Sequence, residues 1–193
     1  LKARMISWPF GLYDCAAQTD GAAAVVITRA DLAPKEAVRV KGVTVIAGPN
    51  PQKDPENDFL SWKPTGWAAE QVYAQAGITK PFDEIDVAQV HDCFTLTELL
   101  TYEDLGFIEK GAAKEHIASG TFELSGDLPV NTDGGLKAFG HPTGATGVRM
   151  IYENVLQLRG KAGPRQVGEP KLALSHNIGG HPTACGIAIL GRD

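Results

Sequence analysis

The stretch LKAFGHPTGATGVRM, from Leu136 to Met150, places a single histidine on a constrained turn at the entrance to a predicted helix. Gly140 tolerates backbone angles that other residues avoid, and Pro142 fixes its own φ at about −65°, so His141 lies on a stiffened turn. The residues that follow, 143–147, open the helix with free N–H groups, which attract an anion or an oxyanion. This pattern favours an acid–base or hydrogen-bonding role for His141, although the same residues would also build a plain helix entry with the imidazole at the surface.

Strands and helices alternate on both sides of this loop. Strands are predicted at 21–28, 38–48, 85–90, 171–180 and 183–190, and helices at 65–78, 95–107, 110–118 and 148–158. The alternation predicts an α/β layered sandwich with a mixed five-stranded sheet. Composition turns polar near residues 29–37, so we expect residues 1–30 to end one domain and residues 31–193 to form the next. The loop between the last two helices is about twenty residues long, which is typical of a functional loop.

Composition excludes several classes of protein. The chain has 193 residues, is 43% hydrophobic and carries a net charge of −5, which argues against a nucleic-acid partner. Membrane insertion is not expected, because no apolar run approaches the ~18 residues of a spanning helix. The three cysteines, Cys15, Cys93 and Cys185, lack metal-ligand or disulfide spacing, so we expect no metal site and a reducing, cytoplasmic location.

Polar residues follow two of the predicted strands, where open α/β sheets bind their ligands. His91, Asp92 and Cys93 come after one strand, and Ser175, His176 and Asn177 fall at another. A neighbouring imidazole stabilises a thiolate, but a free cysteine such as Cys93 is more commonly a small core residue. Beyond Asn177, the backbone N–H groups of Gly179 and Gly180 can approach a ligand closely, as can those of an ordinary turn between two strands.

In chain order these segments resemble the C-terminal half of a thiolase of the sterol-carrier-protein type, a group that includes lipid-transfer proteins and acetyl-CoA acetyltransferases. HDCF (residues 91–94) looks like that group's version of a thiolase motif, and LPVNTDGGLKAFGHPTGATG (128–147) is similar to its active-site loop. LSHNIGG (174–180) stands where ordinary thiolases have a Cys-x-Gly motif, and LYDCAAQTDGAAAVVIT (12–28) resembles the last strand region of the family's N-terminal domain.

The resemblance implies a thiolase-like layered α/β/α fold, usually dimeric, that makes or cleaves a carbon–carbon bond between acyl-CoA thioesters. It assigns His141 to activating a nucleophilic cysteine and holding a thioester oxygen. It also assigns His91 to an oxyanion hole and Cys93 to acid–base work, with Gly179 or Gly180 as a backbone donor. No permanently bound cofactor is implied, and a coenzyme A thioester would be the substrate.

The nucleophilic cysteine of such an enzyme would lie in a separate N-terminal half, because Cys15 falls in the wrong segment. We therefore expect this chain to be inactive alone and to work with an N-terminal thiolase half or a separate chain, in a homodimer or hetero-oligomer. Two alternatives remain open at this point: a thiolase-like retro-aldolase acting on a β-hydroxyacyl-CoA, and a non-catalytic subunit that binds acyl-CoA or lipid.

Overall fold

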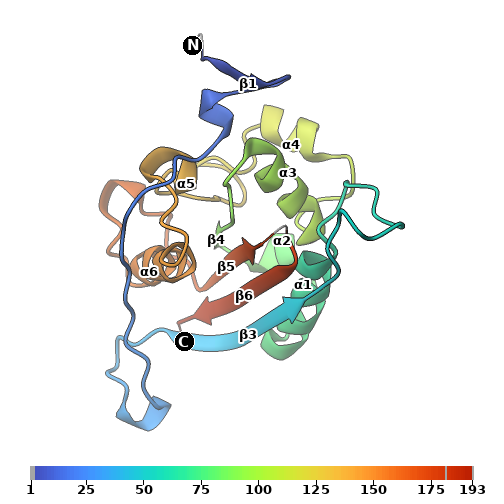
Figure 1. The fold of residues 1–193 in the computed structure, drawn as a ribbon. Coiled ribbons are helices and arrows are strands. Elements are labelled where there is room, and N and C mark those ends of the chain that lie inside the picture. Colours follow the sequence, from blue (N-terminus) through green and yellow to red (C-terminus); the bar gives the residue numbers. More distant parts are fainter. Residues whose placement is uncertain (1–2, 181, 193) are drawn as a thin grey trace.

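The centre of the molecule is a four-stranded mixed sheet in the order β3-β6-β5-β4 (Figure 1), in a computed structural model that describes residues 3–180 and 182–192. The strands are β3 (Arg39–Ala47), β4 (Val87–Gln89), β5 (Leu172–Gly179) and β6 (Ala184–Gly191). β6 is antiparallel to both β3 and β5, and β4 runs parallel to β5. An α/β arrangement built on a mixed sheet is therefore as the sequence predicts.

The predicted count of five strands is wrong by one. The segment expected as a strand at 21–28 has no strand partner, and Val26 and Ile27 in it are 96% and 83% exposed. An apolar, β-branched run becomes a strand only when a neighbour accepts its backbone hydrogen bonds. Among the described residues none does so at this point. A separate two-stranded ribbon of β1 (Met5–Ser7) and β2 (Phe10–Gly11) precedes this segment.

Helices cover the two faces of the sheet unequally (Figure 1). α1 (Lys63–Ala76) packs on β3 and β6, while α6 (Thr146–Leu158) packs on β5 and β4 from the other face. α1 ends where Gly77 adopts a left-handed conformation and its N–H bonds to Tyr73. The strand interiors and α1 enclose the main apolar core, which includes Val72, Leu174 and Ile187.

The shorter helices lie along the chain between α1 and α6. They are α2 (Pro81–Glu84), α3 (Thr95–Asp104), α4 (Ala113–Ala118) and α5 (Gly135–Phe139), and three short 3₁₀ turns cover Leu12–Asp14, Ala30–Leu32 and Gly163–Arg165. The long loop predicted before α6 is therefore interrupted by α5. No helix among the described residues combines the length and apolar character needed to span a membrane.

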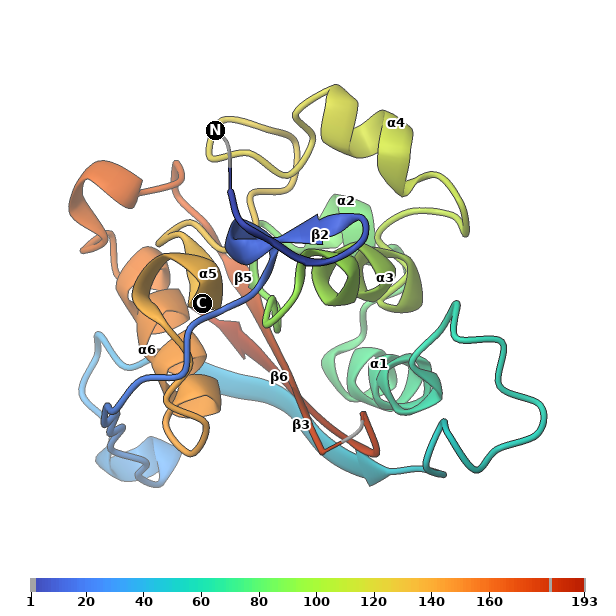
Figure 2. The same ribbon diagram turned by 45° about the horizontal axis from the view of Figure 1, so that its top comes forward.

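An extended N-terminal segment, residues 15–21, crosses the loops that follow β4 and α5; we call it the arm. Cys15 forms an antiparallel bridge with Phe94, and Gln18 forms a parallel bridge with His141. The N–H of Ala16 donates to the carbonyl of Cys93 (2.8 Å), and the carbonyl of Ala17 accepts from the N–H of His141 (2.7 Å). Figure 2 shows this segment leaving the two-stranded ribbon and passing α5. The arm thus brings two loops that are far apart in sequence alongside one another.

Candidate functional site

His91 lies just beyond β4 and is 4% exposed. Its ring Nδ1 is 2.7 Å from Oδ1 of Asn177 on β5. A carbonyl oxygen only accepts hydrogen bonds, so Nδ1 carries the proton and Nε2 presents a lone pair. Burial lowers the pKa of His91 to about 4, which the bond to Asn177 opposes and the nearby His141 reinforces. His91 is therefore a neutral imidazole at pH 7.

His141 meets His91 edge to face, with ring centroids 5.0 Å apart and ring planes at 83°. Its Nδ1 is 2.7 Å from the hydroxyl of Thr146 at the start of α6. Burial lowers the pKa of His141 below its ordinary value. Gly140 supplies the turn before it at φ +91°, where a Cβ would lie 2.2 Å from Cγ2 of Thr19 in the arm. Only glycine fits this position, so the arm and the turn are held together closely.

Cys93 lies on the loop between β4 and α3, with its sulfur 3.8 Å from the Thr97 hydroxyl. Burial raises the pKa of this thiol, the Thr97 hydroxyl opposes the rise, and the nearby Asp92 adds to it. The backbone of Cys93 bonds to Ala16, next to the Ala17 that holds His141. Cys93 is therefore a protonated thiol at neutral pH, on a loop that bonds to the arm one residue before the histidine turn does.

The glycine pair predicted as a backbone donor lies at the end of β5. Gly179 is the last residue of that strand, and Gly180 follows it at φ +67°. Asn177 and Gly179 share a face because side chains alternate along a strand. The structure thus places Gly179 two residues along from the Asn177 that bonds His91. Among the described residues, neither Gly179 nor Gly180 hydrogen-bonds to the ring of His91 or His141.

His176, next to Asn177, belongs to the opposite face of the sheet. It is fully buried, and its Nε2 is 3.1 Å from the hydroxyl of Thr65 in α1. Burial lowers the pKa of His176 to about 3. Cys185 is also buried, in β6, and burial raises its pKa to about 12. Both residues are structural.

Asp92 has a role that the sequence pattern left unassigned. Its two carboxylate oxygens accept the N–H groups of Leu136 (2.8 Å) and Lys137 (3.3 Å), which are the first turn of α5. A Cβ on Gly135 would lie 2.3 Å from Oδ2 of Asp92, so the approach depends on that glycine. Burial raises the pKa of Asp92 to about 6, and the charge of Glu98 adds to the rise. The glycine pair at 134–135 was the signal that could have found this contact.

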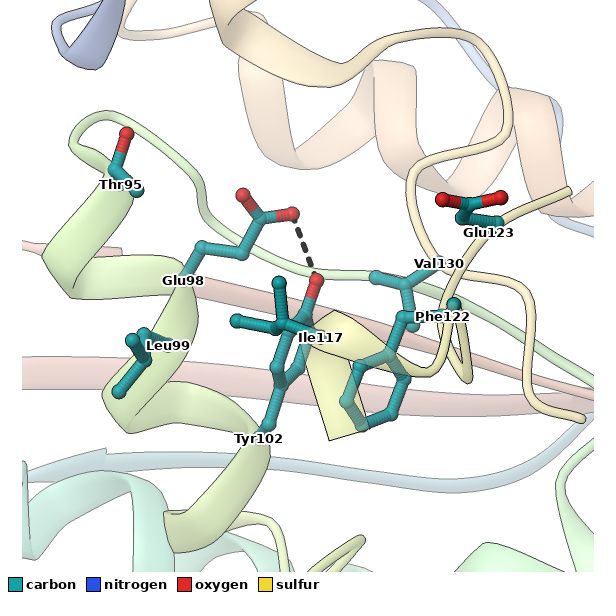
Figure 3. Close-up of a pocket in the computed structure, with 9 residues that line it drawn as sticks. Thr95, Glu98, Leu99, Tyr102, Ile117, Phe122, Glu123 and Val130 are labelled. Carbon is teal, nitrogen blue, oxygen red and sulfur yellow. Dashed lines mark hydrogen bonds between the residues drawn. The ribbon is translucent and has the colours of Figure 1, made fainter. Parts of the chain in front are cut away.

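Glu98 on α3 connects the elements behind Asp92. Its Oε1 accepts from the Tyr102 hydroxyl and from Nδ2 of Asn131, both at 2.9 Å, and its Oε2 pairs with Nζ of Lys137 at 2.6 Å. Figure 3 shows the Glu98–Tyr102 bond at the wall of a cavity of about 280 Å³ between α3 and α4. Both oxygens of this carboxylate accept hydrogen bonds from protein donors, so Glu98 acts as a structural link, here called a brace, between α3 and α5.

The arm and Thr146 were also missed from the sequence. Nothing local in residues 15–21 indicates which loops they will cross. For Thr146 a signal existed, namely a hydroxyl placed five residues after His141 at a helix start. A hollow of about 440 Å³ is lined by both the arm and the turn after His141, with Thr19, Gly21 and Pro142 in its walls. Among the described residues, no cluster of three or more His, Cys, Asp or Glu is arranged to hold a metal ion.

Several known proteins are similar to this chain in sequence. The model of the family "Thiolase C-terminal domain-like" matches residues 51–192. An acetyl-CoA acetyltransferase of Methanothermobacter thermautotrophicus is 40% identical over 100% of this chain, which covers 50% of that protein. Sterol carrier protein 2 of Gallus gallus is 35% identical over 93% of this chain, which covers 34% of that protein.

Among solved structures, a chain of the Ltp2-ChsH2(DUF35) aldolase aligns with a TM-score of 0.82 and 29% identity. The alignment covers 100% of this chain and 50% of that one. The chain therefore spans half the length of the acetyltransferase and of the aldolase chain, and about a third of the length of sterol carrier protein 2.

Proposed function

Because this chain belongs to the thiolase family and corresponds to its C-terminal domain, we propose that it takes part in making or breaking carbon–carbon bonds in acyl-CoA thioesters. The observation that carries the proposal is the edge-to-face pair of neutral imidazoles, His91 and His141, with the thiol of Cys93 two residues along the chain from His91. The nucleophilic cysteine comes from an N-terminal half or a separate chain, since this chain covers only half of its acetyltransferase relative.

Each group has a step that its protonation state suits. The neutral ring of His141 takes the proton of the nucleophilic thiol, and the resulting N–H then donates to the oxygen of the thioester as negative charge develops there. His91 lies beside it with its Nδ1–H held by Asn177, so it donates to the same oxyanion only after Nε2 has taken up a proton. Cys93, held as a thiol by burial, exchanges a proton with the α-carbon of the second acyl group. The glycines at 179–180 supply backbone N–H groups toward an acyl oxygen.

The test is an activity assay after co-expression of this chain with an N-terminal thiolase half that carries a cysteine on a strand-to-helix turn. Cleavage of a 3-oxoacyl-CoA by coenzyme A yields two simple acyl-CoA thioesters and is followed by the loss of the enolate absorbance of the 3-oxoacyl group. Cys93→Ser and His141→Asn should each lower kcat by roughly 10² to 10⁴-fold. Cys185→Ala, in the core away from these groups, is the matched control and should retain activity. Tight acyl-CoA binding without turnover would instead favour a non-catalytic subunit.

The name of the structural neighbour favours one alternative, retro-aldol cleavage of a β-hydroxyacyl-CoA. That reaction uses the same oxyanion donors but needs no nucleophilic cysteine. Alkylation of the complete assembly with iodoacetamide separates the two. An aldolase keeps its activity after alkylation, whereas a thiolase loses it. The untreated enzymes also differ, because an aldolase releases a free aldehyde or ketone and a thiolase consumes coenzyme A.

A further inference from the structure

We infer that Thr146 is a positioning residue that fixes the proton of neutral His141 on Nδ1 and leaves Nε2 as the open, proton-accepting atom. The inference starts from the hydroxyl at the first residue of α6, which is 1% exposed and lies 2.7 Å from Nδ1 of His141. A hydroxyl can donate one proton only, so its other partner decides the direction of this bond.

That other partner is the carbonyl oxygen of Pro142, 3.2 Å from the Thr146 hydroxyl. A carbonyl oxygen cannot donate, so the hydroxyl donates to it and must accept from the imidazole. The ring Nδ1 of His141 is thereby the donor. In a neutral imidazole the remaining nitrogen, Nε2, then carries the lone pair.

The backbone holds this arrangement in place. The N–H of Thr146 also bonds to the Pro142 carbonyl (3.1 Å), which closes the first turn of α6 around the residues between them. On the other side, the N–H of His141 is held by Ala17 of the arm. The backbone on both sides of the pair is therefore fixed, and a flip of the ring would break the 2.7 Å bond between Nδ1 and the Thr146 hydroxyl.

A fixed tautomer matters for the reaction that we propose, and this consequence rests on the proposed function. A base that must take a proton from a thiol and then donate it to an oxyanion has to use one nitrogen for both steps. With Nδ1 already protonated, Nε2 is the only atom that can accept the proton. The Thr146 hydroxyl also stabilises the imidazolium that forms, because it continues to accept from Nδ1–H.

The tautomer itself can be tested without any activity. We propose long-range ¹H–¹⁵N correlation spectra of the uniformly ¹⁵N-labelled 193-residue chain at pH 7.5, with the His141 signals assigned from their loss in His141→Gln. The two nitrogen types of a neutral imidazole differ widely in chemical shift. The expected result is a protonated Nδ1 and an unprotonated Nε2 at His141.

Three variants make the result specific. Thr146→Val keeps the shape and removes the hydroxyl, so the ring should move toward the Nε2–H tautomer or a mixture of the two. Thr146→Ser should restore the Nδ1–H form. Thr101→Val is the matched control, because the buried Thr101 hydroxyl also bonds to a helix carbonyl four residues earlier (2.8 Å). It should leave His141 unchanged.

Two outcomes overturn the inference: an Nε2–H ring in the unmodified chain, or a Nδ1–H ring that persists in Thr146→Val. A thermal melt of each variant shows whether it is folded, and if Thr146→Val does not fold, the spectrum of the unmodified chain and that of Thr146→Ser still decide. Failure of the proposed reaction would leave these spectra unaltered, so the two ideas fail separately.

Discussion

At the scale of single residues, the neutral state of His91 is the most consequential feature. The pKa of His91 is about 4 in the folded chain and has its ordinary value of 6.5 in the unfolded chain. Between these pH values the unfolded chain binds a proton at this residue and the folded chain does not. Stability must therefore fall as pH drops from about 6.5 toward 4. Asp92 works in the opposite sense, because its raised pKa lets the folded state bind a proton first between pH 6 and 4.

We expect His91→Asn to lose less stability on acidification than the unmodified chain. Between pH 7 and pH 5 the difference should be about 2 kcal/mol, since the variant no longer has this buried base to protonate. Urea unfolding at the two pH values measures it. Asp92 and His176 are present in both proteins, so the difference reports the titration of His91 together with its coupling to His141 and His176. Equal declines would show that His91 titrates normally.

Asn177 offers a second residue-scale test. The Nδ1–H of His91 now faces the neutral amide oxygen of Asn177 at 2.7 Å. Asn177→Asp should replace that oxygen with a carboxylate and so favour the charged imidazolium. The pKa of His91 should rise from about 4 toward its ordinary value, as followed by an NMR titration of the ring protons. Asn177→Ser, which adds no charge, is the control. An unchanged titration would place Asn177 away from the ring in solution.

At the scale of elements, the arm and the turn before α6 depend on each other. Gly140 has φ +91°, and a Cβ there would meet Thr19 at 2.2 Å. Gly140→Ala should therefore destabilise the protein by about 2 kcal/mol or more, through backbone strain and the clash together.

Of the two effects in Gly140→Ala, only the steric clash involves the arm. The clash can therefore be measured separately from the backbone strain at residue 140. Adding Thr19→Ala to Gly140→Ala should recover part of the loss and leave the backbone part, as a double-mutant cycle of urea unfolding will show. Strict additivity of the two substitutions would mean that the arm does not lie against the turn.

α3 and α5 are joined through Glu98, and Tyr102 gives a mild probe of that brace. Tyr102→Phe removes the 2.9 Å bond to Glu98 but keeps the ring stacked on Phe122, so it should cost about 1 kcal/mol. Tyr73→Phe, which loses a bond to the carbonyl of Leu105, is the matched control for a buried tyrosine. Only Tyr102→Phe should also shift the amide signals of Asp92 and Lys137 in an NMR spectrum.

At the scale of the whole molecule, the exposed surface is large. It is 10977 Å², against roughly 8,900 Å² for a compact monomer of this mass. Several large apolar side chains contribute to it, among them Trp8 (84% exposed) and Val45 (77% exposed). Val45 lies on the face of β3 that α6 does not reach. Exposed apolar surface of this extent favours a partner.

We expect the isolated chain to bind a hydrophobic dye such as ANS and to lose that binding when an N-terminal thiolase half is added. The reason is that the partner buries the uncovered face of β3 and the N-terminal residues. Dye fluorescence and light scattering after a sizing column measure both effects. A monomeric chain with no dye binding would speak against any such partner.

Much of this protein was determined by sequence alone. The 3.6-residue and two-residue periodicities, with Gly77 as a helix end, determined α1, α6, β3, β5 and β6, because apolar faces must be buried wherever the chain goes. The motifs around His91 and His141 carried the thiolase resemblance, which the family match confirms. Local chemistry is enough for these features because each depends on neighbours a few residues away.

Only the tertiary structure decided what depends on distant contacts. The run at 21–28 has strand composition, yet it stays unpaired because β propensity needs a second strand to accept its hydrogen bonds. Residues 91 and 141 meet edge to face, and the arm crosses both of their loops, through contacts between segments as far apart in sequence as Gln18 and His141. The protonation of the two rings depends on the same contacts. A ring's pKa and tautomer are set by burial and by the partner it meets, and neither is written in its local sequence.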